Sequence, residues 1–181
     1  MFSMNDSVEK IMESGDVFVE RKVGIVTGAG SGIGRAIALL MARRRASLVL
    51  VDVVSEGVST LAEEIRQSGG EAIACQADVG DQADVNRCVE RALEHYGQID
   101  AVVNNAGISP KKSNGAKACL TEISLAEWER VMRVNLTSVF LMCSACIPHM
   151  VARGRGAIVN ISSSAALDGG FLAAAHYSAS K

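Results

Sequence analysis

Short apolar runs alternate with amphipathic stretches along most of this chain, and this alternation restricts the possible fold more than any other feature. Three of the runs consist almost entirely of Val, Ile, Leu and Ala, as in strands that helices cover on both faces. The stretches between the runs have helical periodicity. This order predicts an α/β fold with a mainly parallel sheet. We expect strands at residues 23–27, 48–51, 72–76, 101–104 and 157–161, and helices at about 33–45, 55–68, 82–96 and 125–153.

Length and composition favour one folding unit with a substantial core. The chain has 181 residues, of which 49% are hydrophobic and 21% charged. Its mean hydropathy is +0.22, which is too apolar for a disordered chain. We expect one domain at residues 22–181, preceded by an N-terminal extension at residues 1–21. The net charge of -2 leaves no basic excess for phosphates, so we expect no nucleic-acid partner.

The start of the chain and its longest uncharged stretch bear on location. The first sixteen residues carry four acidic groups, one Lys and no apolar run, so they fit neither a secretory nor a mitochondrial leader. We therefore expect a cytoplasmic protein. Residues 135–152 are uncharged but include Asn, Thr, Ser and His, which makes them too polar for a membrane span. We expect a buried helix there and no membrane association.

The five cysteines are an odd number scattered along the chain, so reduced thiols are expected rather than a disulfide framework. Cys143 and Cys146 form a C-x-x-C pair inside an apolar helical pattern, without the second Cys pair or paired His of a zinc site. Core packing is the favoured interpretation, and redox or metal use is the alternative. We expect no metal site.

The first expected strand leads directly into a glycine-rich turn from which the first helix begins. Glycines at such a turn let backbone N–H groups approach a pyrophosphate, whose charge a helix N-terminus favours. The glycines follow G-x-x-x-G-x-G from Gly28, so the literal G-x-G-x-x-G string is absent, and a turn that serves packing alone is the alternative. The turn has the sequence Thr27-Gly28-Ala29-Gly30-Ser31-Gly32-Ile33-Gly34.

A carboxylate at the end of the second strand indicates which dinucleotide would bind. Asp52 lies eighteen residues beyond Gly34, where a dinucleotide-binding fold needs an acceptor for the adenosine ribose. A carboxylate there repels a 2'-phosphate, and Ser31 and Val53 are neutral where a phosphate-binding Arg could stand. We therefore favour NAD(H) over NADP(H). Arginines at residues 43–45 could bind the 2'-phosphate of NADP(H). They lie at the end of the first helix, however, where cations complement the helix dipole.

Two further motifs, taken with the glycine turn, resemble the short-chain dehydrogenase/reductase family in its single-domain form. They are Asn104-Asn105-Ala106-Gly107 after the fourth strand and Tyr177-Ser178-Ala179-Ser180-Lys181 at the end of the chain. The resemblance covers about residues 22–181 and rests on the order and spacing of the motifs at successive strand ends. It implies a doubly wound Rossmann-type parallel sheet with helices on both faces. Because the family continues past this point, we expect the last strands of the sheet to be missing.

The resemblance also assigns residues to the cofactor. It implies that Asp78 and Val79 contact adenine, with Asp78 accepting from the exocyclic amine. It implies that Asn105, Ala106 and Gly107 lie along the ribose, with Asn105 and Gly107 using mostly backbone atoms, while an ordinary Asn-Gly turn is the alternative. The expected cofactor-binding residues are Gly28, Gly30, Ser31, Gly32, Ile33, Gly34, Asp52, Asp78, Val79, Asn105, Ala106, Gly107, Tyr177 and Lys181.

Four catalytic residues follow from the same resemblance: Asn135, Ser163, Tyr177 and Lys181. Asn135 would hold a water that relays protons, and Ser163 would orient the substrate oxygen. Ser163 is selected by counting forward from the fifth strand. Counting back from Tyr177 selects Ser164 instead, because the intervening loop is one residue longer than is usual in the family. Ser162 is expected to face the other way and bond to the backbone.

The chemistry expected of the last motif depends on its spacing. Tyr177 and Lys181 are four residues apart, so they share one face of a helix, where an ammonium favours the phenolate form of a tyrosine. Tyr177 would exchange a proton with the substrate while hydride moves to or from nicotinamide. His176 adjoins Tyr177 but diverges from it by about a hundred degrees on a helix, so it is expected to line the pocket or face solvent.

The resemblance therefore implies an oxidoreductase that transfers hydride between NAD(H) and a secondary alcohol or ketone. A catalytically silent nucleotide-binding fragment is the alternative. The identity of the small-molecule substrate stays open, because the loop at residues 111–121 and the segment beyond Lys181 would set it. A homodimer or homotetramer is expected for the full-length protein.

Overall fold

The computed structural model of the chain describes residues 21–167 and 173–181. The expected N-terminal extension therefore lies, apart from Arg21, outside the described residues. The same is true of part of the loop between Ser163 and Tyr177.

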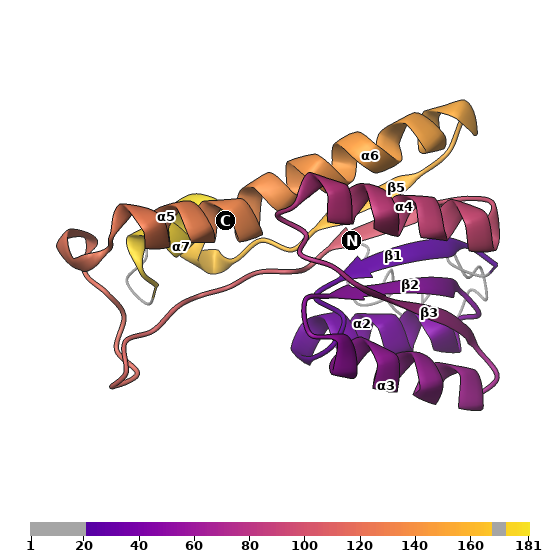
Figure 1. Ribbon diagram of the computed structural model, residues 1–181, viewed down its shortest axis with the longest axis horizontal. Coiled ribbons are helices and arrows are strands. Elements are labelled where there is room, and N and C mark those ends of the chain that lie inside the picture. The colour runs from indigo at the N-terminus through magenta and orange to yellow at the C-terminus, as the bar shows by residue number, and fades with distance from the viewer. Residues whose placement is uncertain (1–20, 168–172) are drawn as a thin grey trace, which may run out of the picture.

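Five parallel strands form one sheet in the order β3-β2-β1-β4-β5 (Figure 1). Each strand begins and ends within one residue of its predicted position, because the apolar runs that identified the strands are the segments that pair in the sheet. In the central strand, Ile25 is aligned with Val49 on one side and with Val102 on the other. The strands are β1 (Val23–Thr27), β2 (Ser47–Asp52), β3 (Glu71–Gln76), β4 (Ala101–Asn104) and β5 (Ala157–Asn160).

Helices cover both faces of the sheet, which confirms the predicted doubly wound α/β fold. In Figure 1, α2 (Gly32–Arg43) and α3 (Ser55–Gln67) lie below the strands, and α4 (Gln82–Tyr96) and α6 (Ser138–Ala152) lie above them. Successive side chains of a strand point to opposite faces. Leu50 accordingly packs in the core with residues of α2 and α3, whereas the adjacent Val51 packs in the core with residues of α4 and α6.

The segment predicted as one helix at residues 125–153 contains a local change of geometry. It comprises α5 (Leu125–Met132), a π-helical turn (Arg133–Thr137) and α6. A short helix, α7 (Ala175–Ser180), contacts α5 beyond the carboxyl ends of the strands (Figure 1). Between β4 and α5 the chain forms a long loop that includes most of the loop expected at residues 111–121, and a 3₁₀ turn (Leu120–Glu122) follows it.

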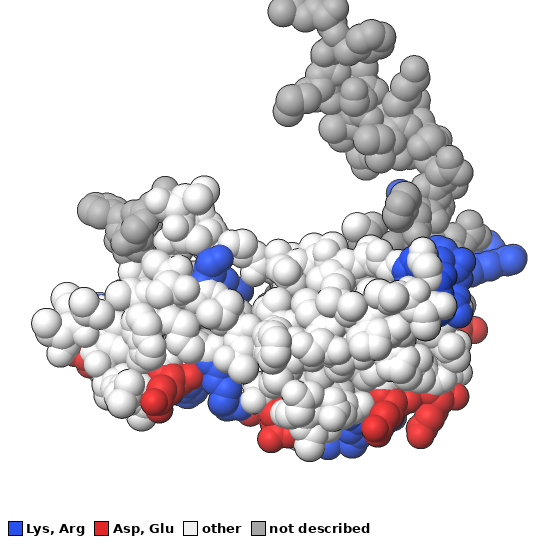
Figure 2. All heavy atoms as spheres, turned by 90° about the horizontal axis from the view of Figure 1, so that it is seen from above, with Lys and Arg blue, Asp and Glu red and all other residues white. Residues whose placement is uncertain are grey.

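The prediction of a buried helix at residues 135–152 is wrong for one of its faces. Leu141, Met142, Cys146 and Met150 pack into the core, but Phe140 is 67% exposed and Val151 71% exposed. Figure 2 shows that the face of the molecule over α6 is almost free of charged side chains. By length and composition alone, Leu125–Ala152 is long and apolar enough to cross a membrane.

The cysteines behave largely as core residues. Cys75, Cys88 and Cys146 are buried and all five cysteines are free thiols. The sulfur atoms of Cys75 on β3 and Cys88 on α4 are in contact within the core shared by α4 and α6. For the C-x-x-C pair, core packing is confirmed at Cys146, whereas Cys143 is only partly buried. Cys119 is exposed.

A buried carboxylate aligns three strands at their amino ends. Asp100 Oδ2 accepts a hydrogen bond from the Val23 amide at 3.0 Å. The Asp100 amide donates to the Val23 carbonyl, and the Asp100 carbonyl accepts from Ala157. Arg155 lies 3.2 Å from the other carboxylate oxygen, so the buried charge is compensated. Asp100 therefore fixes the register of β1, β4 and β5.

Replacing Asp100 should destabilise the fold. Asp100→Ala leaves the Val23 amide without its side-chain acceptor and Arg155 without its partner, so we expect a loss of about 2–4 kcal/mol in the free energy of unfolding, measured with urea. Asp100→Asn keeps one acceptor oxygen and should lose less. Glu63→Ala, which removes an exposed pair with Arg66, is the control and should change stability by about 0.5 kcal/mol or less. Equal midpoints for Asp100→Ala and the control would contradict this account.

Candidate active site

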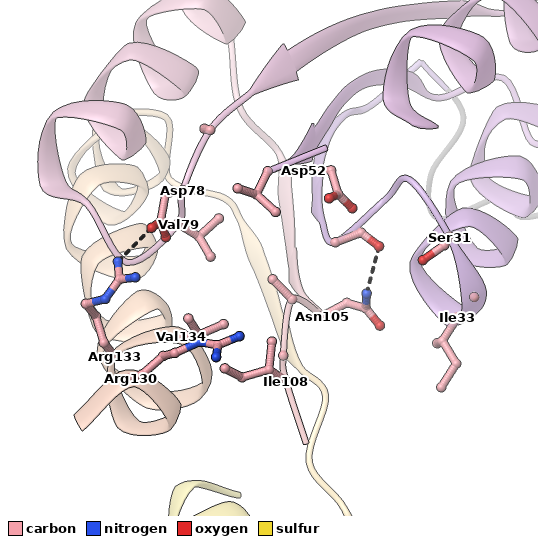
Figure 3. Close-up of a pocket in the computed structure, with 16 residues that line it drawn as sticks. Ser31, Ile33, Asp52, Asp78, Val79, Asn105, Ile108, Arg130, Arg133 and Val134 are labelled. Atoms are coloured by element: carbon pink, nitrogen blue, oxygen red, sulfur yellow. Dashed lines mark hydrogen bonds and ion pairs between the residues drawn. The ribbon is translucent and has the colours of Figure 1, made fainter. Parts of the chain in front are cut away.

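A cavity of about 660 Å³ opens at the carboxyl ends of the central strands (Figure 3). It lies where the sheet reverses its winding, since β1 has β2 on one side and β4 on the other. Open α/β sheets bind their ligands at such a switch point. The lining residues are Gly28, Ser31, Gly32, Ile33, Asp52, Val53, Ala77, Asp78, Val79, Asn105, Ala106, Gly107, Ile108, Arg130, Arg133 and Val134.

The cavity brings together ten of the predicted cofactor residues. Gly30 and Gly34 belong to the same turn without lining the cavity, and neither Tyr177 nor Lys181 is among the lining residues. Sequence reasoning did not place Val53, Ala77, Ile108, Arg130, Arg133 or Val134 at the cofactor. The two arginines are separated from the glycine turn by about a hundred residues, and on their own helix they have the pattern of solvent-facing charges.

The glycine turn needs its glycines because of close backbone contacts. Gly28 has φ +64°, a conformation that glycine adopts without steric cost. A Cβ on Gly34 would lie 2.1 Å from the Gly28 carbonyl oxygen, so only glycine lets α2 start this close to β1. The α2 N-cap, Ser31, makes no side-chain cap hydrogen bond, and the first turn has no acidic residue. The helix therefore presents N–H groups that can bind an anion.

Asn105 holds this turn against the end of β4. Its Nδ2 donates to the Thr27 carbonyl at 3.0 Å and to the Gly28 carbonyl at 3.2 Å. Its backbone amide donates to Thr27 Oγ1 at 3.0 Å. The prediction that Asn105 uses mostly backbone atoms missed this role of the side chain, which is to fix the turn that borders the cavity.

Asp52 lies at the edge of the cavity with both carboxylate oxygens oriented by backbone amides. Oδ2 accepts from Gly30 and Oδ1 accepts from Val54, each at 3.0 Å. A Cβ on Gly30 would lie 3.0 Å from Asp52 Oδ2, so glycine keeps the carboxylate close to the turn. The half-buried side chain retains free lone pairs toward the cavity, as a ribose acceptor requires.

Asp78 lines the cavity opposite Asp52, and it is already paired. Its Oδ2 accepts from Arg133 Nη1 at 2.8 Å, and its Oδ1 accepts from the Gly80 amide at 2.9 Å (Figure 3). Partial burial raises the pKa of Asp78, but the hydrogen bonds from Arg133 and Gly80 outweigh it and hold the pKa below its usual value.

Asn135 lies in the π-helical turn and is only 3% exposed. Its Oδ1 accepts from the Ile108 amide at 2.7 Å. Its Nδ2 donates to the Ile108 carbonyl and to Ser180 Oγ, each at 2.9 Å. Asn135 therefore connects the loop after β4 to the helix that carries the Tyr177 motif.

Lys181 approaches the cavity from α7. Its Nζ donates to the Ile161 carbonyl at 2.9 Å. A Cβ on Gly107 would lie 3.2 Å from Lys181 Nζ and 3.4 Å from Asn135 Oδ1. The Lys181 ammonium and the Asn135 amide oxygen therefore both lie beside Gly107, which lines the cavity. Burial lowers the pKa of Lys181. The charged form of the Lys181 side chain is therefore less favoured at this position than in water.

The serines after β5 differ in their contacts. Ser163 Oγ accepts from the Ala165 amide at 3.2 Å, and Ser162 Oγ donates to the Lys181 backbone carbonyl at 2.9 Å. The expectation that Ser162 bonds to the backbone is met. The Ser163 hydroxyl still has its proton to donate, whereas Ser164 begins a 3₁₀ turn and is exposed.

The prediction that His176 lines the pocket or faces solvent is wrong. His176 is fully buried and does not line the cavity. Its Nε2 is 2.9 Å from Glu127 Oε1, and its Nδ1 accepts from the Tyr177 amide at 2.9 Å. Because Ala174, the N-cap of α7, makes no side-chain cap bond, His176 supplies an acceptor to the first turn of that helix. The helical-wheel argument missed the packing of α7 against α5.

Comparisons with known proteins place this geometry in a family. The family model described as short chain dehydrogenase matches residues 22–181. The chain is 43% identical over 149 residues to the cis-4-hydroxycyclohexanecarboxylate dehydrogenase of Sinomonas cyclohexanicum, an alignment covering 82% of this chain and 57% of the relative. It is 38% identical to the cyclohexanol dehydrogenase of Acinetobacter sp. (strain SE19), covering 93% of this chain and 66% of that one.

Solved structures agree with the sequence relatives. A 3-oxoacyl-[acyl-carrier protein] reductase with bound NAD from Brucella melitensis superposes with a TM-score of 0.83 at 38% identity, covering 89% of this chain and 60% of that one. A 7α-hydroxysteroid dehydrogenase complexed with NADH and 7-oxo glycochenodeoxycholic acid gives a TM-score of 0.82 at 30% identity, covering 93% and 63%. The chain spans little more than half the length of the first curated relative. It belongs to the short chain dehydrogenase family.

Proposed function

We propose that the protein is an NAD(H)-dependent oxidoreductase that interconverts a secondary alcohol and a ketone. The observation that carries this proposal is the cavity at the switch point of the sheet. The glycine turn and Asp52 border it on one side, and Gly107 connects it to Asn135 and Lys181 on the other. A dinucleotide needs such an extended site, with an anion-binding end and a reactive end.

The residues around the cavity fit NAD(H). The uncapped start of α2 suits the pyrophosphate, and Asp52 suits the 2'- and 3'-hydroxyl groups of the adenosine ribose. Two solved relatives support this assignment, since one is a reductase with bound NAD and the other is a dehydrogenase complexed with NADH. Bound nicotinamide would supply the hydride acceptor or donor.

We assign the transfer of the proton to and from the substrate oxygen to Tyr177. In alcohol oxidation its phenolic oxygen would take the hydroxyl proton, and in ketone reduction it would return a proton to the same oxygen. Ser163 would donate a hydrogen bond to the substrate oxygen and so fix its position. Lys181 would supply positive charge near the phenol, and Asn135, tied to Ile108 and Ser180, would hold α7 in place.

The class of substrate follows from the chemistry and the relatives. Relatives named for cyclohexanol, for a hydroxycyclohexanecarboxylate and for a hydroxysteroid support a secondary alcohol or the matching ketone. We further propose a cytoplasmic location and, for the full-length protein, a homodimer or homotetramer.

Calorimetric titration with NADH, run beside a screen of ketone reduction and alcohol oxidation, tests the proposal. We expect saturable 1:1 binding and turnover of at least one secondary alcohol or ketone. Binding without turnover in this chain and in a longer form of the same protein would support the silent nucleotide-binding alternative. No binding of NADH at millimolar concentration to folded protein would overturn the proposal.

Tyr177→Phe should remove turnover and spare cofactor binding. Loss of the phenolic proton carrier should lower kcat by about 100-fold to 10,000-fold, while the Kd of NADH changes by less than about twofold. Tyr96→Phe is a matched control, because the chain has two tyrosines and the Tyr96 hydroxyl bonds only to the Leu48 carbonyl, at 3.4 Å, among the described residues. Unreduced kcat in Tyr177→Phe would eliminate this mechanism.

Asp52→Ala should weaken NADH binding more than NADPH binding. The substitution removes the ribose acceptor and also removes the negative charge that opposes a 2'-phosphate, so we expect about a tenfold loss for NADH and a smaller change for NADPH. Asp52→Asn helps to separate the two effects, because it removes the charge but keeps one acceptor oxygen, which can serve only one of the Gly30 and Val54 amides. Equal losses for both cofactors in fluorescence titrations would count against the argument for NAD(H).

A further inference from the structure

An arginine that the sequence motifs do not include reaches the far wall of the cavity. Arg133 lies in the π-helical turn between α5 and α6, and its guanidinium contacts the Asp78 carboxylate at the end of β3 (Figure 3). We propose that Arg133 is a positioning residue for the adenosine end of the cofactor: it fixes the turn formed by residues 78–80 in the shape that borders the cavity. The inference rests on the proposed function, because the ligand of that cavity is taken to be NAD(H).

The turn at residues 78–80 depends on the orientation of one carboxylate. Asp78 Oδ1 accepts from the Gly80 amide and Asp78 Oδ2 accepts from Arg133. The Asp78 amide donates to Asp84 Oδ2 at 2.8 Å, which connects the turn to the start of α4. Each carboxylate oxygen has a second lone pair. Asp78 can therefore accept a hydrogen bond from a ligand while its orientation is held by Arg133.

Gly80 leaves the space in which the arginine packs. A Cβ added to Gly80 would lie 2.5 Å from Arg133 Nη1, 2.9 Å from its Cγ and 3.1 Å from its Cζ. The side chain of Arg133 thus lies directly against the turn along much of its length. Gly80 does not have a positive φ, so an alanine could occupy this backbone conformation, but it would displace the arginine.

The pair also adjusts the charge of the cavity. Asp52 and Asp78 both line it, and the proposed ligand carries a negative pyrophosphate. Two uncompensated carboxylates would repel that ligand. Arg133 neutralises Asp78, whereas Asp52 is held by neutral backbone amides.

A purely structural role is a weaker explanation of the contact. The side chains of Arg133 and Asp78 are 45% and 36% exposed, and exposed ion pairs contribute little to stability. The π-helical turn also supports a functional role for Arg133, because the same turn carries residues of both ends of the site. It carries Arg133 to the adenosine end of the site and, two residues later, carries Asn135 to Ile108 and Ser180 at the other end.

Titration of unmodified and substituted protein with NADH and with ADP-ribose tests the proposal. Arg133→Met should raise the Kd of both ligands by about fivefold, with the melting temperature of the unliganded protein nearly unchanged. Arg133→Lys keeps the charge and should recover part of the loss. Amide hydrogen exchange of residues 78–84 should accelerate in unliganded Arg133→Met, which is a readout independent of the cofactor.

Two further variants distinguish positioning from a direct contact with the ligand. Gly80→Ala keeps the charge of Arg133 but displaces it, so it should weaken binding as Arg133→Met does, and the two losses should not add. In an Asp78→Asn background, Arg133→Met should cause little further loss. Arg66→Met removes an exposed arginine of α3 that pairs with Glu63 and should leave both Kd values unchanged.

The outcomes separate this inference from the proposed function. If the unmodified chain binds NADH but Arg133→Met leaves both Kd values and amide exchange unchanged, the positioning role is overturned and the proposed function stands. Full additivity of Arg133→Met and Asp78→Asn also overturns it, because the arginine would then contact the ligand directly. If the unmodified folded chain binds neither ligand, both proposals fail.

Discussion

The hydrogen bonds between the ends of β1 and β4 are the constraint on which the rest of the site depends. Asn105 bonds to the carbonyls of Thr27 and Gly28, and Thr27 Oγ1 accepts from the amides of Asn105 and Ala106 while donating to the Val103 carbonyl. These bonds keep the two strands together at the point where their continuing chains separate toward opposite faces of the sheet. The cavity lies in that separation, so its floor is set by buried polar contacts rather than by loop conformation.

The two ends of the site are built on different supports. The glycine turn and Asp52 belong to β1, α2 and β2, which pack tightly in the core. Lys181 directly follows the short helix α7, whose neighbours are α5 and the segment after β5. The π-helical turn contacts both regions, since it places Arg133 against Asp78 and Asn135 against Ile108 and Ser180. Irregular helical turns of this kind occur frequently at functional sites.

The sequence predicted the strands, the glycine turn and the order of the helices because each leaves a local signature in apolar periodicity or glycine spacing. It did not predict the contacts of Arg133, which is 55 residues from Asp78 and has the pattern of a surface charge. The burial of His176 depends on Glu127, 49 residues away, and no local pattern encodes that contact. The exposed face of α6 was missed for a related reason. Apolar composition indicates that a helix is buried, but it does not show which face of the helix packs against the rest of the protein.

The strand order also has a consequence for synthesis on the ribosome. One edge of β1 pairs with β2, which follows it by about twenty residues, but the other edge pairs with β4, which ends at Asn104. At roughly 5–20 residues per second, β4 is completed about 4–15 s after β1. During that interval the central strand, which is buried along its whole length in the folded protein, has one unpaired edge in the nascent chain. An unpaired strand edge can pair with another chain, so neighbouring nascent chains would compete with β4 for this edge.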